Sequence, residues 1–274
     1  HTARHATPGE PPVTTRLSRP EWAVLATCAV LLLVALLAPG ITQPADYHGF
    51  ADQRGWGGIP HALNVLSNLP FAIGGVWGLW ALQRAPRAAL LPVERRMAAL
   101  FFAGLVLTSF CSGWYHWLPN NAGLALDRLG MAVAFAGLLG LAAADRISAR
   151  AGHAVGWGVL VLALLSVAVS AVTGNVLPWG LVQFGGVALV VVLVFVKPVP
   201  GAMGVSIGLT IALYALAKVF EHFDAQVYTL TGEVLSGHSL KHLVASLAAW
   251  PVLAAVWRAS ALVSARAQGR PGTL

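Results

Sequence analysis

The sequence predicts an all-α integral membrane protein, and three observations lead to this fold class. Of the 274 residues, 57% are hydrophobic and only 10% are charged, and the mean hydropathy is +0.73. Soluble domains contain about 25% charged residues. Apolar runs of roughly 20 residues also recur along the whole chain, which is the length that a helix needs to cross a bilayer. We therefore expect a bundle of transmembrane helices.

Eight apolar runs are each long enough to form one transmembrane helix. A hydrocarbon core about 30 Å thick requires about 20 helical residues, because each residue adds about 1.5 Å to a helix. Proline or glycine occurs at nearly every junction between the runs, as is typical of turns. The predicted helices span residues 21–39, 60–82, 94–116, 123–144, 153–174, 178–196, 203–222 and 236–259.

The two ends of the chain are expected to lie outside the helical core. The first apolar run follows several arginines and has a leucine-rich centre, which also fits a signal peptide. It ends at Pro39 and Gly40 without a small-x-small cleavage site, so we interpret residues 21–40 as an additional transmembrane helix. Residues 1–20 are expected to form a disordered N-terminal tail, and residues 260–274 a disordered cytoplasmic tail.

Basic residues fall in alternate loops, which predicts the orientation of the bundle. Most Lys and Arg side chains precede the first run or lie in every second loop after it, whereas the other loops contain Arg54 alone, beside several acids. Both termini are then cytoplasmic. The net charge of +7 follows from this topology, and no basic stripe interleaved with aromatic residues indicates a nucleic-acid partner. The composition is typical of a GC-rich bacterial genome, so we expect the inner membrane.

Five polar residues interrupt the apolar runs near the outer, periplasmic surface. Ser112 and His116 lie in the last turns of one predicted helix, and Asp127 lies about one turn into the next. His238 and His242 lie in the first turns of the last helix, where a spacing of four places both on one face. Ionisable side chains inside a membrane are costly and mark functional sites. We expect all five to converge in one leaflet.

The residue types in this group are those of a hydrolytic zinc site. Three histidines, His116, His238 and His242, leave one tetrahedral position free, which is typical of catalytic zinc. Asp127 could carry a proton from water to a leaving amine, and Ser112 could donate a hydrogen bond to an oxyanion. Each residue also has a simpler interpretation when it is taken alone.

The simpler interpretations are structural. A single intramembrane histidine is more often hydrogen-bonded to another helix than bound to a metal, and a lone serine such as Ser112 packs between helices. Asp127 could instead complement a helix N-terminus or pair with the adjacent Arg128. Three histidines at compatible depth, two of them four residues apart, favour the metal site.

Four segments together resemble the alkaline ceramidase family, which belongs to a group of seven-helix membrane hydrolases that also includes adiponectin-receptor-like proteins. The similarity covers residues 60–257, and the joint spacing makes it specific. Its elements are S-x-x-x-H from Ser112 to His116, the following Asp127, G-H-S-L-K-H from Gly237 to His242, and N-V-L-S-N from Asn64 to Asn68.

The resemblance implies a seven-helix catalytic domain at residues 60–259, with residues 21–40 as one additional N-terminal transmembrane helix. It implies zinc on His116, His238 and His242, and Ser112 and Asp127 at the catalytic water. The implied reaction cleaves the amide of ceramide or a related N-acyl lipid to a fatty acid and a long-chain amine. The family also has a calcium-binding glutamate three residues before the asparagine that matches Asn64. This chain has His61 there, which makes calcium dependence doubtful.

Two further polar groups lie near the same leaflet. Lys218 and Glu221, beside His222, have the spacing of a structural ion pair, although contact with a substrate headgroup is the alternative. Asn64 and Asn68 could position metal ligands or join helices by hydrogen bonds.

Two other functions remain open at this stage. A non-enzymatic receptor of the adiponectin-receptor-like kind would keep zinc for structure, and Asp127 would then be dispensable. A transporter would need polar residues that thread the membrane, whereas here they collect near one surface. The lipid substrate is expected to enter from the bilayer, and the sequence determines neither its acyl length nor the oligomeric state.

Overall fold

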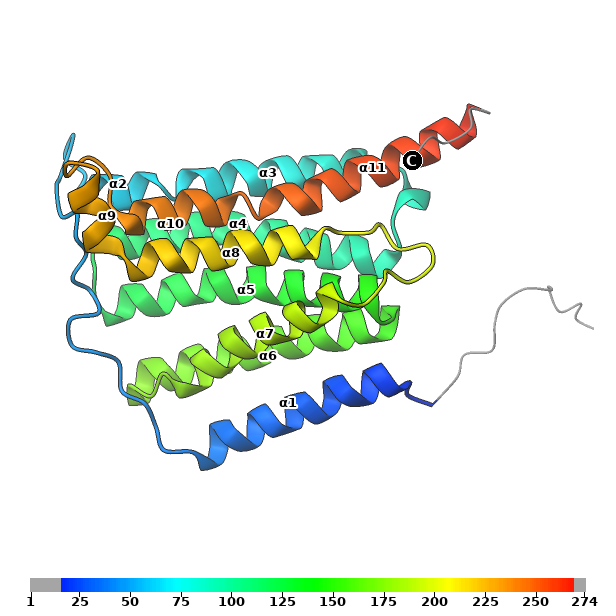
Figure 1. The fold of residues 1–274 in the computed structure, drawn as a ribbon, viewed down its shortest axis with the longest axis horizontal. Helices are drawn as coiled ribbons and strands as arrows, with labels where there is room; N and C mark the ends of the chain where they lie inside the picture. Colours follow the sequence, from blue (N-terminus) through cyan, green and yellow to red (C-terminus); the bar gives the residue numbers. More distant parts are fainter. Residues whose placement is uncertain (1–15, 269–274) are drawn as a thin grey trace, which may run out of the picture.

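The computed structural model describes residues 16–268 and shows a bundle of long helices (Figure 1). Within these residues there is no β-strand, and one short 3-10 helix, Arg87–Ala89, precedes α4. The helices are α1 (Arg19–Leu37), α2 (Ala62–Leu66), α3 (Leu69–Arg84), α4 (Pro92–Trp117), α5 (Asn121–Arg146), α6 (Ala149–Thr173), α7 (Leu177–Val194), α8 (Ile207–His222), α9 (Asp224–Leu230), α10 (Gly237–Ser246) and α11 (Ala249–Ala267).

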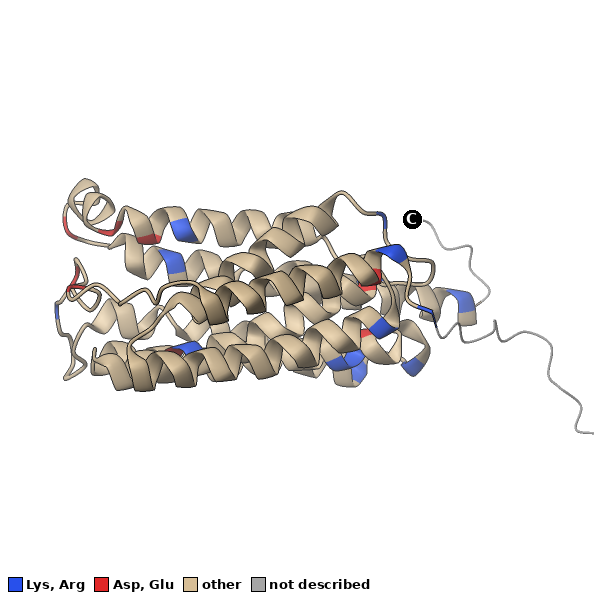
Figure 2. Ribbon diagram, turned by 90° about the horizontal axis from the view of Figure 1, so that it is seen from below, with Lys and Arg blue, Asp and Glu red and all other residues tan. Residues whose placement is uncertain are grey.

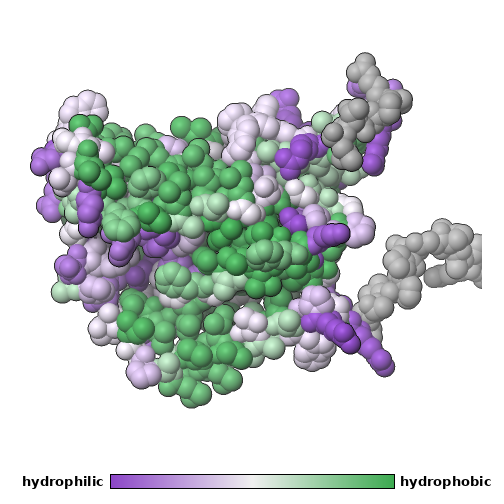
Figure 3. All heavy atoms as spheres, viewed as in Figure 1, coloured by the Kyte–Doolittle hydropathy of each residue, from purple (hydrophilic) through white to green (hydrophobic). Residues whose placement is uncertain are grey.

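Among the described residues, seven helical segments are long and apolar enough to cross a membrane, which confirms the predicted all-α membrane bundle. They are α1, α2 with α3, α4, α5, α6, α7, and α10 with α11. The eighth predicted span, α8, has 16 residues and is shorter than these seven, but it packs beside α10 within the bundle. On the face shown in Figure 3, hydrophobic side chains cover much of the middle of the bundle.

Two predicted helices are each broken into two pieces. The first break, at Ser67 and Asn68, comes just before Pro70 in the first turn of α3. The second, at Leu247 and Ala248, comes just before Pro251 in the first turn of α11. Proline has no amide hydrogen and its ring restricts the preceding residue, so a new helix begins there. These breaks lie within two otherwise continuous spans.

Small residues allow α4 and α5 to pack at very short range. A Cβ atom on Gly104 would lie 2.3 Å from the Ala134 nitrogen, and one on Gly137 would lie 2.2 Å from the Phe101 nitrogen. Such contact between backbones is typical of helix pairs in membranes. It holds the end of α4 and the start of α5, which carry three of the predicted site residues, in a fixed relation.

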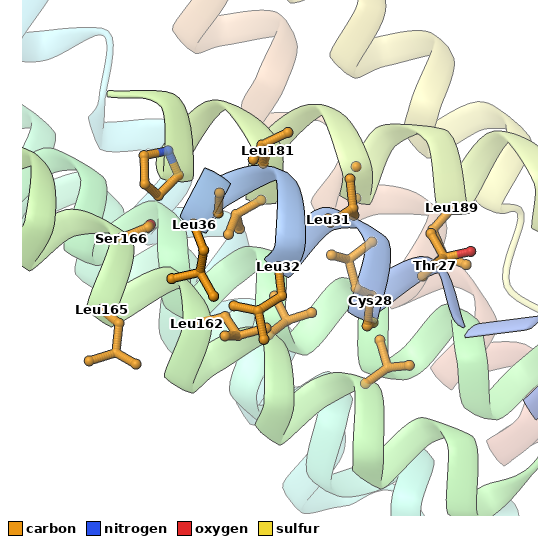
Figure 4. Close-up of a pocket in the computed structure, with 18 of the residues that line it drawn as sticks. Thr27, Cys28, Leu31, Leu32, Leu36, Leu162, Leu165, Ser166, Leu181 and Leu189 are labelled. Carbon is orange, nitrogen blue, oxygen red and sulfur yellow. The ribbon is translucent and has the colours of Figure 1, made fainter. Parts of the chain in front are cut away.

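The N-terminal helix α1 is attached to the bundle mainly through its two ends. At one end Glu21 accepts hydrogen bonds from Ser148 and Arg150, and at the other the Asn175 side chain accepts one from the Ile41 nitrogen. Between these ends, α1, α6 and α7 line an apolar cavity of about 420 Å³, with Leu31 and Leu32 among its walls (Figure 4).

The predicted tails differ from the structure at the C-terminus. Residues 260–267 belong to α11 and are not a disordered tail, because Ala, Leu and Arg are good helix formers and continue the helix beyond the bundle. At the other end α1 begins at Arg19, capped by the Ser18 side chain. The expectation for residues 1–15 falls outside the described part of the chain, as does that for residues 269–274.

Charged residues gather toward the ends of the helices, with many of the Lys and Arg side chains toward one end (Figure 2). This agrees with the uneven distribution of basic residues on which the predicted orientation depends. The structure thus describes a multi-pass membrane protein, whereas its orientation and the membrane that contains it remain predictions.

Candidate metal centre

Three histidines from distant parts of the sequence meet in the interior. His116 comes from the last turn of α4, and His238 and His242 come from the first turns of α10. All three are buried, with exposed fractions of 1%, 6% and 4%, respectively. One ring nitrogen from each lies within 4.8 Å of the others. The predicted convergence is confirmed for the three proposed metal ligands.

The spacing of the ring nitrogens fits a tetrahedral metal ion. The Nε2 atoms of His116 and His238 lie 3.2 Å apart. Two nitrogens bound to zinc at about 2.0–2.1 Å with tetrahedral angles would lie about 3.3–3.4 Å apart. This pair of nitrogens therefore has the spacing of two zinc ligands, and a ring nitrogen of His242 lies within 4.8 Å of both. Nitrogen ligands of this kind also suit other transition metals.

Hydrogen bonds orient His242 for metal binding. Its Nδ1 lies 2.8 Å from the Ser67 Oγ, and Ser67 Oγ donates to the Asn64 carbonyl oxygen, 3.1 Å away. Because this serine hydrogen is already used, Nδ1–H donates to Ser67 and the lone pair of Nε2 points to the cluster. The His116 Nδ1, by contrast, has no hydrogen-bond partner among residues 16–268. Sequence reasoning missed Ser67, which lies within the N-V-L-S-N segment.

The start of α10 is fixed by several polar contacts. The Asp224 carboxylate accepts a hydrogen bond of 2.7 Å from the backbone N–H of His238 and one of 2.9 Å from the backbone N–H of Ala51. Asn64 accepts one of 2.9 Å from the Ser239 hydroxyl and donates to the Asp52 carbonyl oxygen. Asn64 therefore joins α2 to α10, which is the interhelix hydrogen bonding that was one of its two predicted roles.

An aromatic ring from the segment before α2 covers the cluster. The Phe50 ring centroid lies 4.8 Å from that of His116 and 4.5 Å from that of His238. Phe50 is 6% exposed. Its packing limits the access of water to the imidazoles from this side. No pattern in the sequence identified Phe50, because a single aromatic residue in a loop carries no periodic signal.

A cavity of about 390 Å³ adjoins the histidines, and both predicted catalytic residues line it. Ser112 is buried and Asp127 is half-buried, and the two residues line the same cavity from α4 and α5. Most of the remaining wall is apolar. Its hydrophobic members include Phe71, Phe101, Leu105, Met131, Phe135 and Leu138.

Arg128 does not form the ion pair with Asp127 that was one structural alternative for this aspartate. Its guanidinium donates to Gln43 and to the hydroxyl of Ser170, and no ion pair between Asp127 and Arg128 occurs within residues 16–268. The Asp127 carboxyl group is thus left facing the cavity beside Ser112.

The expected pair of Lys218 and Glu221 is present, and a third residue joins it. Lys241 of α10 also contacts Glu221, with 2.6 Å between Nζ and Oε1. All three residues line the cavity. We gave Lys241 no role from the sequence, although a lysine between two metal-binding histidines in an apolar helix is such a signal. His222 does not line this cavity, nor does His61.

The loop before α2 contains an ion pair. The Arg54 guanidinium bonds both carboxylate oxygens of Asp52 at 2.8 Å and also donates to the Val234 carbonyl oxygen. This contact lowers the pKa of the Asp52 carboxyl group below its usual range. The Asp52 oxygens are thus already occupied by a cation.

The fold and the histidine cluster define a helical membrane protein with a candidate metal centre. No protein-family model matches the chain, and no curated protein matches its sequence.

Proposed function

We propose that this protein is a zinc-dependent membrane amidohydrolase. It cleaves the amide of ceramide or a related N-acyl lipid and releases a fatty acid and a long-chain amine. The observation that carries the proposal is the meeting of three buried imidazoles, two of which line the same mainly apolar cavity as Ser112 and Asp127.

The donor set suits a catalytic metal. Three neutral imidazoles leave a fourth tetrahedral position, and His116, His238 and His242 would hold the ion. Zinc supplies Lewis acidity, which polarises a carbonyl group and makes water more acidic. Burial of the ligands supports this role, because uncharged imidazole is the form that binds metal.

Asp127 and Ser112 supply the proton transfers and the hydrogen bond that amide cleavage needs. The Asp127 carboxylate accepts a proton from the attacking water and later gives a proton to the nitrogen of the leaving amine. The Ser112 hydroxyl donates a hydrogen bond to the carbonyl oxygen as negative charge develops there. Water adds to the carbonyl carbon, the C–N bond breaks, and the products are a carboxylic acid and an amine.

The apolar wall supports a lipid substrate. Phe71, Phe101 and Met131 belong to three different helices and line the same cavity as the polar groups. An acyl chain held against these side chains would place its amide beside the histidines. Each methylene group removed from water stabilises binding by about 0.8 kcal/mol.

The test combines metal analysis with product detection. Purified protein should contain one zinc per chain and release fatty acid from at least one member of a panel of N-acyl lipids. His238→Ala should lose both properties, and Asp127→Ala should keep zinc but lose hydrolysis. His153→Ala, which removes a histidine of α6 outside this cavity, is the matched control and should change neither.

The same experiment separates the hydrolase from a receptor with a structural ion. A protein that holds a full complement of zinc yet releases nothing from any N-acyl lipid would contradict the proposed function.

A further inference from the structure

The apolar cavity between α1, α6 and α7 is separate from the candidate metal centre. It has a volume of about 420 Å³ and shares no wall residue with the cavity beside the histidines. Leu and Val side chains form most of its wall, and no charged side chain of the described residues lines it (Figure 4). We refer to it as the α1 cavity. The proposed reaction makes no use of it.

The α1 cavity is elongated along the helices. On α1 its wall extends from Val24 to Leu36, and on α6 from Val155 to Val169. With a rise of about 1.5 Å per residue, these stretches are about 18 Å and about 21 Å long. The acyl chains of one leaflet span about half of a hydrocarbon core that is about 30 Å thick. The cavity is thus long enough for one extended acyl chain.

Water is a poor occupant of this cavity. A buried water molecule needs several polar partners, whereas apolar cavities of about 150 Å³ stay dry and bind hydrocarbons such as benzene. Two polar side chains of the wall are already engaged. The Ser166 hydroxyl donates to the Ala163 carbonyl oxygen, and the Asn175 side-chain oxygen accepts the backbone N–H groups of Ile41 and Leu177. An apolar ligand therefore suits the cavity.

The molecules next to the α1 cavity are bilayer lipids. In the membrane-crossing stretch of α1 only 6% of the residues are buried, whereas the other six spans found among the described residues have 17–56%. Leu36 of α1 and Leu165 of α6 line the cavity and are 71% and 58% exposed. The cavity is therefore open on one side, and an acyl chain can enter it laterally from the membrane.

The attachment of α1 excludes a helix from a second copy of the chain as the occupant. Glu21 and Ile41 bind the two ends of α1 to the core. Between them Leu31 lies so close to α7 that a Cβ atom on Gly185 would be 2.7 Å from its Cδ1. A helix with its side chains is about 10–12 Å wide and would have to separate α1 from α7. A flexible acyl chain is much narrower.

We propose that the α1 cavity binds one acyl chain of a bilayer phospholipid, which fills the space between the additional helix and the core. This site is independent of the proposed hydrolysis, and no bond forms or breaks there. The bound chain supplies the apolar contacts that α1 does not receive from the protein. Phospholipid should therefore remain with the purified protein after the surrounding lipid has been removed.

The test is photo-crosslinking in nanodiscs of a phosphatidylcholine that carries a diazirine in the middle of one acyl chain, with the labelled residues identified by mass spectrometry. Leu139 and Val155 line the cavity but are only 5% exposed, so the surrounding bilayer has little access to them. We expect label at these residues. Label confined to exposed residues of α1 outside the cavity, such as Val30 and Leu33, would show ordinary surrounding lipid and overturn the inference.

Variants that fill the cavity should remove the interior label. Cys28→Trp places a large side chain in the cavity. Ala26→Trp is the matched control, because residue 26 lies outside the cavity on the opposite face of α1. We expect the label at Leu139 to be lost in Cys28→Trp and kept in Ala26→Trp. Label kept in both variants, or lost in both, would contradict the inference. Leu32→Trp also fills the cavity and replaces Cys28→Trp if that variant does not fold.

Lipid analysis of the purified protein gives an independent measurement. After extensive exchange into detergent, the wild type and Ala26→Trp should retain one phospholipid per chain, and Cys28→Trp should lose it. Zinc content and fatty-acid release should be the same in all three proteins, because the two cavities share no wall residue. Equal amounts of phospholipid in the wild type and in Cys28→Trp would overturn the inference and leave the proposed function untouched.

Discussion

Both ends of the bundle bury charged or polar groups, but they use them differently. At the end where α4 begins, Glu94 and Asp145 are completely buried and accept hydrogen bonds from the nitrogens of Met203 and Gly204. Asp145 also pairs with Arg146 at 3.0 Å. These acids tie the loop between α7 and α8 to the bundle. Their partners belong to the protein itself, which is the usual solution for buried polar groups.

At the opposite end the polar groups face one another across a shared space. The imidazoles of His116, His238 and His242 converge, and the Nδ1 of His116 has no hydrogen-bond partner among the described residues. Two lysines share one carboxylate in the same cavity. The difference teaches that burial alone does not identify a functional site. The convergence of several metal-binding side chains from different helices beside a cavity is what distinguishes the histidine end.

The largest expected difference between the two ends is in activity. Asp127→Asn removes the group that we assign to proton transfer, and should lower kcat about 10²- to 10⁴-fold. Zinc content should be unchanged, because Asp127 is not one of the three ligands. Fatty-acid release and metal analysis on the same preparation measure this. A variant that kept its activity would show that Asp127 has the structural role of a residue such as Glu94.

The second difference is in stability. Asp145→Ala leaves Arg146 without its carboxylate partner and removes an acceptor for two backbone nitrogens, so it should destabilise the fold by about 3–5 kcal/mol. Thermal unfolding in detergent should show a lower midpoint, while zinc per folded chain stays at one. Loss of zinc from the folded variant would mean that the two ends are coupled.

A smaller effect tests the orientation of one ligand. Ser67→Ala removes the acceptor for the His242 Nδ1–H, and loss of such a contact should weaken zinc binding about 10- to 100-fold. Competition with a chelator measures the affinity. Ser109→Ala is the control, since this buried serine of α4 donates to the Asn68 carbonyl oxygen and not to a histidine. Equal zinc affinity in both variants would contradict the role of Ser67.

The smallest effect concerns the ion pair of the loop before α2. The pKa of Asp52 is lowered in the folded protein, so the pair contributes stability above the unfolded pKa of about 3.9 and loses it as the pH falls through the folded value. Asp52→Asn should therefore lower the unfolding midpoint at pH 7, by an amount equivalent to about 1 kcal/mol or less, since Arg54 is half exposed. The difference from wild type should disappear in acid. A difference that persisted there would point to another cause.

Much of the bundle could be predicted because membrane helices carry a strong signal in their length and composition. The convergence of His116, His238 and His242 could be predicted from helix order and depth. The ends of helices were harder to predict. The breaks before Pro70 and Pro251 were not predicted, because each pair of helices lies within one continuous apolar run. The predicted tail was also wrong for residues 260–267, because the sequence S-A-L-V-S-A-R-A contains good helix formers and continues α11.

The contacts around the site could not be predicted, because they join segments that are far apart in the sequence. Phe50 covers the histidines from a loop, and Ser67 lies 175 residues from His242. The partner of Lys241 is 20 residues away on another helix. Such contacts depend on how the helices pack in three dimensions, and helical periodicity does not contain that information.

The most direct test of the central claim is X-ray absorption spectroscopy of the purified protein at the zinc edge, with His238→Ala for comparison. We predict one zinc per chain, bound by three imidazole nitrogens at about 2.0–2.1 Å and one further light atom. The variant should lose the ion or one imidazole from its coordination. A wild type without zinc, or a variant with the same three-imidazole spectrum, would contradict the account.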